Sequence, residues 1–299
     1  MGKRRNNAFD HQLTKSKLRQ TRKKEVRNWL DLPREIMILI FMKLGQVDII
    51  LIAQNVCSSW RKLANEPQLY RTITVQYQDF LRYFDFKPLS SGKFAMLFKE
   101  AFRRSCGQLV GISCETLLDQ DLLNYVVGKP NSLKTLKIGM DVCISVVGFI
   151  LIVKRLPLLE ELDLLIGYYT NDLFKVIGLS CQKLRHLRVD YRNTPCSKME
   201  CERQAFAIAR SMTHLHSLHL IGSKMSNKGL QAILAGCPNL EYLDLRCCFK
   251  ITLEGDVPKE LIGRIRKIEQ QVSNLHVLMT FTCRPAQASN DQVLRQSER

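Results

Sequence analysis

The chain has 299 residues, with 45 Lys and Arg against 28 Asp and Glu, so its formal net charge is +17 at pH 7. This length accommodates one large domain or two. The cysteines number 11, an odd count, and the N-terminus lacks the apolar segment of a secretory signal. We therefore expect buried, reduced thiols in a soluble, intracellular protein. Uncharged apolar stretches such as residues 142–153 are shorter than the roughly 18 apolar residues of a membrane helix, and no membrane contact is expected.

Residues 1–28 carry much of the excess positive charge. They contain ten Lys or Arg residues, only Asp10 and Glu25 as acids, and almost no apolar residues. A segment of this composition is expected to be disordered. Its KRR and RKK runs are compatible with nuclear import, so the expected location is the nucleus, the cytoplasm or both.

Residues 29–71 contain an apolar run without a polar face. Residues 36–42 are all apolar, whereas a surface helix alternates apolar and polar residues with a period of 3.6. Asp31 as a cap and Pro33 in the first turn predict a helix that ends before Gly45. Two shorter helices are expected next, one from Asp48 and one around Cys57, Trp60 and Leu63. So few residues cannot bury this much apolar surface, and one face is expected to meet a partner or the rest of the chain.

The same stretch resembles the F-box, whose pattern combines Leu-Pro-x-Glu-Ile, Val-Cys-x-x-Trp-Arg and a closing aromatic-Arg pair. The closing pair here is Tyr70 and Arg71, where a Trp is more usual in the family. The resemblance implies a module over residues 29–72 that binds a Skp-type adaptor, itself carried by a cullin in a ubiquitin ligase. The motif positions assigned to adaptor binding are Leu32, Pro33, Glu35, Ile36, Ile40, Leu44, Ile50, Val56, Cys57 and Trp60.

Beyond this module, the chain repeats the pattern L-x-x-L-x-L with close variants. The first leucines of the six copies are Leu109, Leu133, Leu159, Leu184, Leu215 and Leu240. They recur every 24 to 31 residues, and leucine-rich repeats have this pattern with a period of roughly 20–29. We interpret the longest interval as a loop insertion near residues 193–201. Residues 73–255 are therefore predicted to form a curved solenoid of about six repeats with a continuous core.

Helical segments are expected between the strands of the solenoid. Their predicted bounds are 93–104, 119–127, 171–179, 202–212 and 227–235. Cys106, Cys181 and Cys237 each precede a repeat leucine by three residues, which resembles the cysteine-containing subclass of leucine-rich repeats. The chain as a whole resembles plant F-box/leucine-rich-repeat proteins. The implied fold is α/β, with a helical F-box followed by a solenoid that has short parallel strands on its concave face and helices on its convex face.

The C-terminal segment lies beyond this pattern. Residues 259–272 show helical periodicity, so a helical cap over the last repeat is predicted within residues 256–283. Residues 284–299 are polar and expected to be disordered.

Catalytic and metal chemistry find little support in the sequence. Cys237, Cys247 and Cys248 lack the C-x-x-C pairing of a zinc site. Neither G-x-x-x-x-G-K nor G-x-G-x-x-G occurs, so no phosphate-binding glycine loop is expected. We expect no catalytic residue, no metal and no cofactor.

Recognition of a partner on the concave face is the remaining role for the repeats. The repeat leucines point into the core, so the residues between them point to the opposite face. Their charges change sign along the array, which does not suit a uniformly charged polymer such as DNA. The residues expected to contact a protein substrate are Thr135, Lys137, Glu161, Asp163, His186, Arg188, His219, Tyr242, Asp244 and Arg246.

Three functions stay open, in decreasing order of support. The first is the substrate-recognition subunit of a Skp-cullin-F-box ubiquitin ligase, which brings a target to ubiquitination and proteasomal degradation without catalysis of its own. The second is a non-degradative leucine-rich-repeat scaffold, distinguished by an adaptor affinity that does not depend on Leu32, Pro33 and Ile36. The third is nucleic-acid binding, which predicts a steep salt dependence that is lost on deleting residues 1–28.

Overall fold

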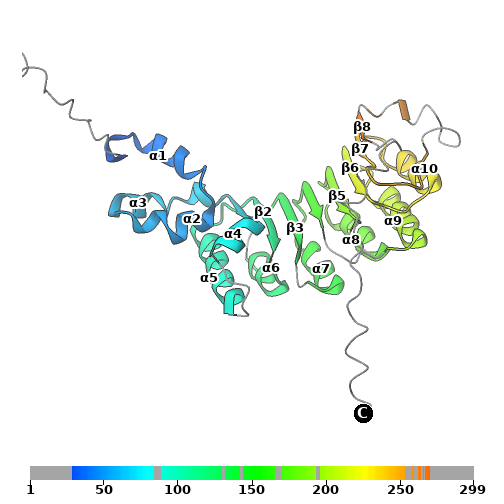
Figure 1. The fold of residues 1–299 in the computed structure, drawn as a ribbon. Coiled ribbons are helices and arrows are strands. Elements are labelled where there is room, and N and C mark those ends of the chain that lie inside the picture. The colour runs from blue at the N-terminus through cyan, green and yellow to red at the C-terminus, as the bar shows by residue number, and fades with distance from the viewer. Residues whose placement is uncertain are drawn as a thin grey trace, which may run out of the picture.

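The computed structural model shows a curved array with a sheet along one side, helices along the other, and a group of short helices at the N-terminal end (Figure 1). The residues that it describes are 29–83, 89–116, 118–129, 132–141, 144–165, 170–192, 196–252, 258, 262–263, 265 and 267–269. The predicted disordered tails, residues 1–28 and 284–299, lie outside the described residues.

Short helices form the N-terminal module, as predicted. They are η1 (Trp29–Asp31), α1 (Arg34–Phe41), α2 (Gln46–Leu51), η2 (Ala53–Asn55), α3 (Ser58–Leu63) and η3 (Pro67–Tyr70). The predicted cap at Asp31 is wrong, because Asp31 belongs to η1 and α1 begins after Pro33 without a side-chain cap. Helix α2 follows Gly45 directly and so starts two residues before the expected Asp48.

All strands of the sheet are parallel and follow one another in chain order. They are β1 (Thr72–Val75), β2 (Gly111–Thr116), β3 (Thr135–Asp141), β4 (Glu161–Leu164), β5 (His186–Asp190), β6 (Ser217–Ile221), β7 (Tyr242–Asp244) and β8 (Lys267–Glu269). Each strand pairs with the next at equivalent repeat positions, for example Leu162 with Leu187. The predicted fold class is therefore confirmed.

Helices connect successive strands on the other side of the sheet (Figure 1). They are α4 (Tyr77–Tyr83), α5 (Leu89–Arg104), α6 (Gln120–Val127), α7 (Val146–Val153), α8 (Asn171–Ser180), α9 (Lys198–Ser211) and α10 (Asn227–Gly236). Helix α9 starts four residues earlier than expected, because Ser197 and Glu200 form a capping box at its first turn. The sequence did not predict α4 or α7, and α7 is apolar throughout, which hides its helical period.

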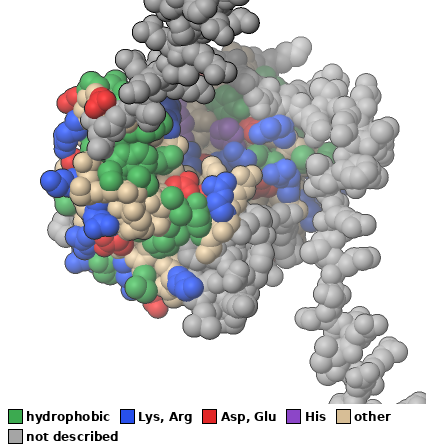
Figure 2. Space-filling view, turned by 60° about the vertical axis from the view of Figure 1, so that its left-hand side comes forward, with side chains coloured by type: hydrophobic (Ala, Val, Ile, Leu, Met, Phe, Trp, Pro, Cys, Tyr) green, Lys and Arg blue, Asp and Glu red, His purple; other side chains and the backbone are tan. Residues whose placement is uncertain are grey.

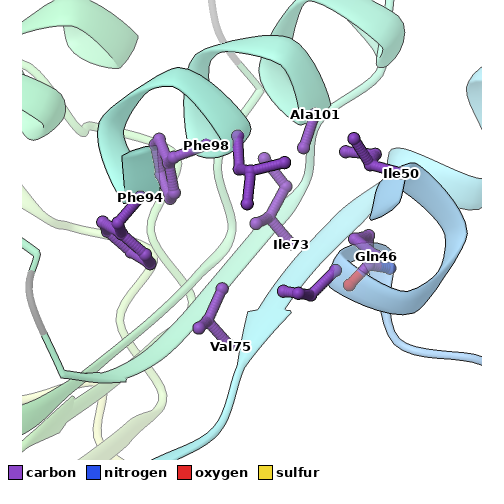
Figure 3. A pocket seen from close by; sticks show the side chains of 9 residues that line it. Gln46, Ile50, Ile73, Val75, Phe94, Phe98 and Ala101 are labelled. Atoms are coloured by element: carbon purple, nitrogen blue, oxygen red, sulfur yellow. The ribbon is translucent and has the colours of Figure 1, made fainter. Parts of the chain in front are cut away.

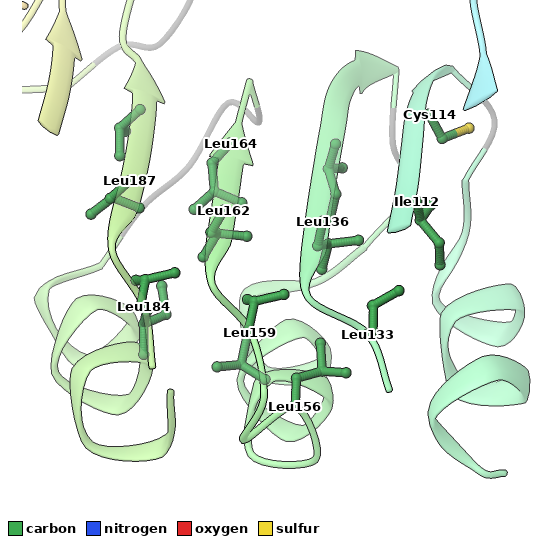
Figure 4. Packing of buried hydrophobic residues seen from close by; sticks show 14 of the residues in the cluster. Ile112, Cys114, Leu133, Leu136, Leu156, Leu159, Leu162, Leu164, Leu184 and Leu187 are labelled. Carbon is green, nitrogen blue, oxygen red and sulfur yellow. The ribbon is translucent and has the colours of Figure 1, made fainter. Parts of the chain in front are cut away.

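The repeat leucines and their equivalents build the core between the sheet and the helices (Figure 4). In all six predicted copies, the three pattern positions are at most 3% exposed. Side chains from neighbouring strands, such as Leu136 and Leu162, lie side by side in register. Each repeat thus covers the apolar side of the next, as a solenoid requires.

The cysteines at the helix-to-strand junctions behave differently from one another. Cys181 and Cys237 are buried, and their thiols donate to the carbonyl oxygens of Leu156 at 3.4 Å and Met212 at 3.5 Å in the preceding repeat. Burial raises the pKa of Cys181 to about 12, which keeps this thiol protonated as a donor. Cys106 is exposed and has a positive φ of 49°. Our expectation of a buried thiol is wrong at Cys106, because the chain turns sharply there after α5.

Strands β1 and β8 extend the array beyond the predicted copies. The prediction of a continuous helix over residues 259–272 is wrong at β8, which pairs in parallel with β7. Ile265 follows Leu240 by one 25-residue repeat and is 9% exposed. At the other end, β1 straddles the predicted boundary between the two modules, and buried Tyr70 occupies the repeat position equivalent to Leu109.

Among the described residues, no single helix is long and apolar enough to cross a membrane. Helix α1 and the segment Gln46–Asn55 reach that length and composition only as a pair, which is bent by 117°. The same part of the chain contains no group of three or more His, Cys, Asp or Glu side chains arranged to hold a metal ion.

Candidate protein-binding surfaces

Helix α1 is apolar on both of its sides. One side packs inward through Met37, Ile38 and Phe41, which are at most 6% exposed. The opposite side carries Ile36 and Leu39, which are 43% and 57% exposed, and residues three to four positions apart share one helix face. This arrangement explains why the sequence has no polar face here.

The N-terminal module carries further exposed apolar side chains outside α1 itself. They are Trp29, Leu32, Met42, Ile52 and Val56, with exposures between 38% and 59%. Figure 2, which turns the N-terminal end forward, shows several hydrophobic patches at this end, with charged and other side chains between and around them. We name the exposed apolar residues from Trp29 to Val56 the α1 surface. An apolar surface of this kind marks a site for another protein.

The motif residues divide between this surface and the interior. Leu32, Pro33, Glu35, Ile36 and Val56 are exposed, so the structure places them where a partner can reach them. Ile40, Leu44, Cys57 and Trp60 are half-buried, and Ile50 is 6% exposed. The predicted set omitted Trp29, Leu39, Met42 and Ile52, although the unbroken apolar run already contained two of them.

Two of the half-buried motif residues support the module from within. The ring of Trp60 packs edge-on against Phe41 and Trp29, with centroid distances of 5.3 and 6.3 Å. Cys57 caps α3, since its Sγ accepts a hydrogen bond from the backbone N–H of Trp60 at 3.5 Å. Trp60 therefore holds α3 against α1, whereas Cys57 stabilises the start of α3 itself.

The N-terminal module joins the repeats without a linker. A small apolar pocket marks the joint, where Ile50 from α2, Ile73 from β1 and Phe98 from α5 face one another (Figure 3). The side-chain amide of Gln46 donates to the Leu69 carbonyl and accepts from the Thr74 backbone N–H, both at 3.0 Å. Ile50 is thus a residue of this joint rather than of the α1 surface.

The first half of the concave face has paired charges. Lys134 forms an ion pair with Glu160 at 2.8 Å. The Nζ atom of Lys137 lies 3.6 Å from a carboxylate oxygen of Glu161 and 3.6 Å from one of Asp163. Four predicted contact residues in this half are half-buried, namely Thr135, Lys137, Glu161 and Asp163. Their outward edges therefore remain accessible.

The second half of the concave face contains a hydrogen-bonded cluster around Asp244. Arg246 donates to both carboxylate oxygens, with an Nη2–Oδ2 distance of 2.6 Å, and His219 Nδ1 lies 3.2 Å from Oδ2. Burial alone raises the pKa of Asp244, but the hydrogen bonds from Arg246 and His219 outweigh it and hold the pKa below its ordinary value. Asp244 is 0% exposed, so it orients Arg246 and His219 instead of contacting a partner itself.

Ser217, His219 and Asp244 form a chain of hydrogen bonds in the order that serine hydrolases use. Ser217 Oγ lies 3.2 Å from His219 Nε2. Ser217 is 9% exposed, and its backbone N–H donates to the Arg185 carbonyl at 3.0 Å within the sheet. An oxyanion hole needs backbone N–H groups that are free to bind the substrate. The Ser217 N–H is therefore not free for that role. The hydrogen bonds with Ser217 and Asp244 hold the His219 ring in place, and the ring stacks on Tyr242 at a centroid distance of 4.8 Å.

The remaining predicted contact residues lie on the same face. His186 is exposed, Arg188, His219 and Tyr242 are half-buried, and Arg246 is exposed. Arg192 repeats the arrangement of Arg246, since it binds Asp190 with an Nη2–Oδ2 distance of 2.7 Å. The predicted set omitted Arg192, although the shared Asp-x-Arg pattern could have revealed it.

A helical module with an exposed apolar surface is continuous with a leucine-rich-repeat solenoid, and this combination defines a class of two-part proteins. The family model described as F-box-like matches residues 29–76. The model for the leucine-rich repeats of FBD-associated F-box protein At5g56370 matches residues 159–256.

Individual relatives cover most of the chain. Putative F-box/LRR-repeat protein 21 of Arabidopsis thaliana is 35% identical, over 83% of this chain and 83% of its own. F-box protein SKIP19 of the same organism is 32% identical, over 84% of this chain and 80% of its own. Putative F-box/LRR-repeat protein 23 is 33% identical, but the match spans only 54% of that relative's length. The chain belongs to the F-box/leucine-rich-repeat family, whose members are typically non-catalytic adaptors.

Proposed function

We propose that this protein is the substrate-recognition subunit of a Skp-cullin-F-box ubiquitin ligase. The α1 surface binds a Skp-type adaptor, which links the chain to a cullin. The concave face of the repeats binds a target protein, which other subunits ubiquitinate and so mark for degradation. The chain contributes positioning, because a bound target lysine has a high effective concentration near the conjugating enzyme.

The observation that carries the proposal is the exposure of the α1 surface. Ile36, Leu39 and Val56 are 43%, 57% and 59% exposed, although large aliphatic side chains each stabilise a protein by about 1.5–3 kcal/mol when buried. An amphipathic or apolar helix commonly binds in a groove of a partner, with anchors at spacings of three and four residues. Ile36 and Leu39 have this spacing and extend from a rigid module.

The proposal is tested by co-purification with a Skp-type adaptor. We expect Ile36→Asp with Leu39→Asp to abolish the complex, because two charges would enter an apolar interface. The control is Leu179→Asp, since Leu179 is 61% exposed on α8, away from the α1 surface. Both variants should fold, since these side chains contribute little to the core.

The outcomes separate the proposed function from the scaffold alternative. Loss of the complex only in the α1 variant supports the ligase function. Undiminished co-purification of that variant would place the adaptor elsewhere. Failure of the unaltered chain to bind any adaptor would favour a leucine-rich-repeat scaffold whose α1 surface binds a different protein.

A further inference from the structure

Arg188 is a cation near the centre of the concave face, and its side chain forms no hydrogen bond or ion pair with any residue that the structure describes. It lies in the middle of β5, and its side chain is half-buried. Its Nε atom is buried and has no hydrogen-bond partner among the described residues. A buried donor without an acceptor is costly and rare in folded proteins. The Nε atom is closed to solvent, but the half-buried side chain leaves its terminal nitrogens, which also lack a partner among the described residues, open to a ligand.

The neighbours of Arg188 are already bound to other groups. In the register of the sheet, Arg188 lies beside Asp163 of β4 and His219 of β6. The carboxylate of Asp163 lies 3.6 Å from Lys137 on its far side. His219 is held by Ser217 and Asp244 through its two ring nitrogens. Neither neighbour supplies an acceptor to Arg188.

The surroundings of Arg188 favour a negative ligand. Asp190 and Asp244 are 6% and 0% exposed, whereas the arginines that bind them, Arg192 and Arg246, are 41% and 48% exposed. Each pair therefore directs the positive end of its dipole outward. A guanidinium binds a carboxylate or phosphate through two parallel hydrogen bonds, which gives both strength and a fixed orientation.

We propose that the second half of the concave face selects target segments with an acidic side chain, and that Arg188 receives its oxyanion. This inference rests on the proposed function, because it assumes that the repeats hold the target. The required chemistry is an oxyanion that accepts two hydrogen bonds, which a carboxylate or a phosphorylated side chain supplies. Arg188 is thus the residue that determines specificity, while the paired charges around Lys137 contribute less to the choice of target.

The test selects peptides from a randomised twelve-residue library for binding to the full chain. Co-purification of the full chain with the adaptor is measured before this selection. We expect the selected peptides to share an acidic residue at one fixed position. Replacing that residue by Gln should weaken binding about tenfold, as expected for loss of a charge-assisted hydrogen bond. In Arg188→Met the tenfold difference should disappear, and in Arg188→Lys it should shrink, because Lys keeps the charge but lacks the planar fork.

The matched control is Arg210→Met, which removes an exposed arginine from α9 on the convex side and should keep the tenfold difference. Peptides with Glu or phosphoserine at the selected position show which source of the oxyanion binds more tightly. Absence of an acidic position, or its persistence in Arg188→Met, would overturn the inference. Adaptor binding is scored separately, so a failure of the ligase function is recognised independently of the peptide result.

Discussion

The hydroxyl of Tyr70 joins the F-box to the first repeat through Arg104. It donates to the Ala64 carbonyl at 2.6 Å and accepts from Arg104 Nη1 at 3.1 Å. Arg104 is the last residue of α5 and also donates to Gln54 Oε1 at 2.8 Å. The indole of a Trp, which is more usual at this position of the F-box, has a donor but no acceptor. Tyr70 and the buried Arg104 therefore act as one unit, which fixes the N-terminal module against the first repeat.

Replacing Tyr70 by Phe tests this joint. Burial raises the pKa of Tyr70, against the lowering effect of Arg104, so the hydroxyl stays protonated and able to donate. Tyr70→Phe should lower the free energy of unfolding by about 1–3 kcal/mol, because it leaves buried polar groups with fewer partners. Urea denaturation measures this change. Tyr125→Phe is the control, since Tyr125 is half-buried, and it should stay within about 0.5 kcal/mol of the unaltered protein. Equal stability of both variants would mean that the joint depends on apolar packing alone.

A repeat leucine tests the strand register. Leu218 is 0% exposed and pairs with Leu187 and Leu243. Leu218→Ala should cost about 2–5 kcal/mol, because the neighbouring repeats cannot collapse into the cavity. Leu179→Ala, at a site that is 61% exposed, should leave the stability within about 0.5 kcal/mol. Thermal unfolding measures both changes. Equal melting temperatures of Leu218→Ala and Leu179→Ala would contradict the strand register.

The fold was predictable from the sequence where the repeat pattern is strict. The leucine patterns from Leu159 to Leu164 and from Leu240 to Leu245 each predict a strand, and the structure buries the pattern leucines of both. The pattern fails at β8, because Ile265 and Ile268 replace leucines and fit a helical period equally well. A strand and a helix cannot be told apart from two or three apolar residues without knowing what they pack against.

The candidate sites were only partly predictable, because exposure depends on packing that the sequence does not encode locally. Ile36 and Ile50 both match the F-box pattern, yet one is 43% exposed and the other 6%. Asp244 and Asp163 occupy the same outward strand position, but Arg246 and His219 cover only Asp244. The sequence could not predict that Arg188 Nε lacks a hydrogen-bond partner among the described residues, because this depends on Asp163 lying beside Lys137 in the sheet.

The pH dependence of stability tests the ion-pair cluster at the end of α5. Hydrogen bonds from Arg103, opposed by partial burial and reinforced by Arg104, lower the pKa of Glu100 from 4.5 to about 2. A carboxyl whose pKa is lower in the folded state stabilises fully above its unfolded pKa and loses this contribution as pH falls toward the folded pKa. Glu100→Gln should therefore be less stable than the unaltered protein at pH 7.

That difference in stability should shrink between pH 4.5 and pH 3, which urea denaturation across this range would show. The control is Glu35→Gln, which removes an exposed carboxylate from α1. A difference for Glu100→Gln that stays constant down to pH 3 would show that the carboxylate does not act through its charge.

Substitution of Arg246 tests whether the Arg246 guanidinium stabilises the buried carboxylate of Asp244. Arg246→Met removes the 2.6 Å contact and leaves a buried carboxylate with His219 as its remaining side-chain partner among the described residues. Burial then raises the pKa of Asp244. The free energy of unfolding at pH 7 should fall by about 1–3 kcal/mol. The deficit should become smaller toward pH 4, where the carboxyl of the variant takes up a proton in the folded state.

A second substitution identifies the cause of this deficit. Asp244→Asn in the Arg246→Met background removes the buried charge and should recover part of the lost stability at pH 7, because a neutral amide is less costly to bury than an unpaired carboxylate. Arg210→Met controls for the loss of an arginine elsewhere and should leave the stability within about 0.5 kcal/mol. If the double variant were no more stable than Arg246→Met, the guanidinium would stabilise the strand through its packing rather than through Asp244.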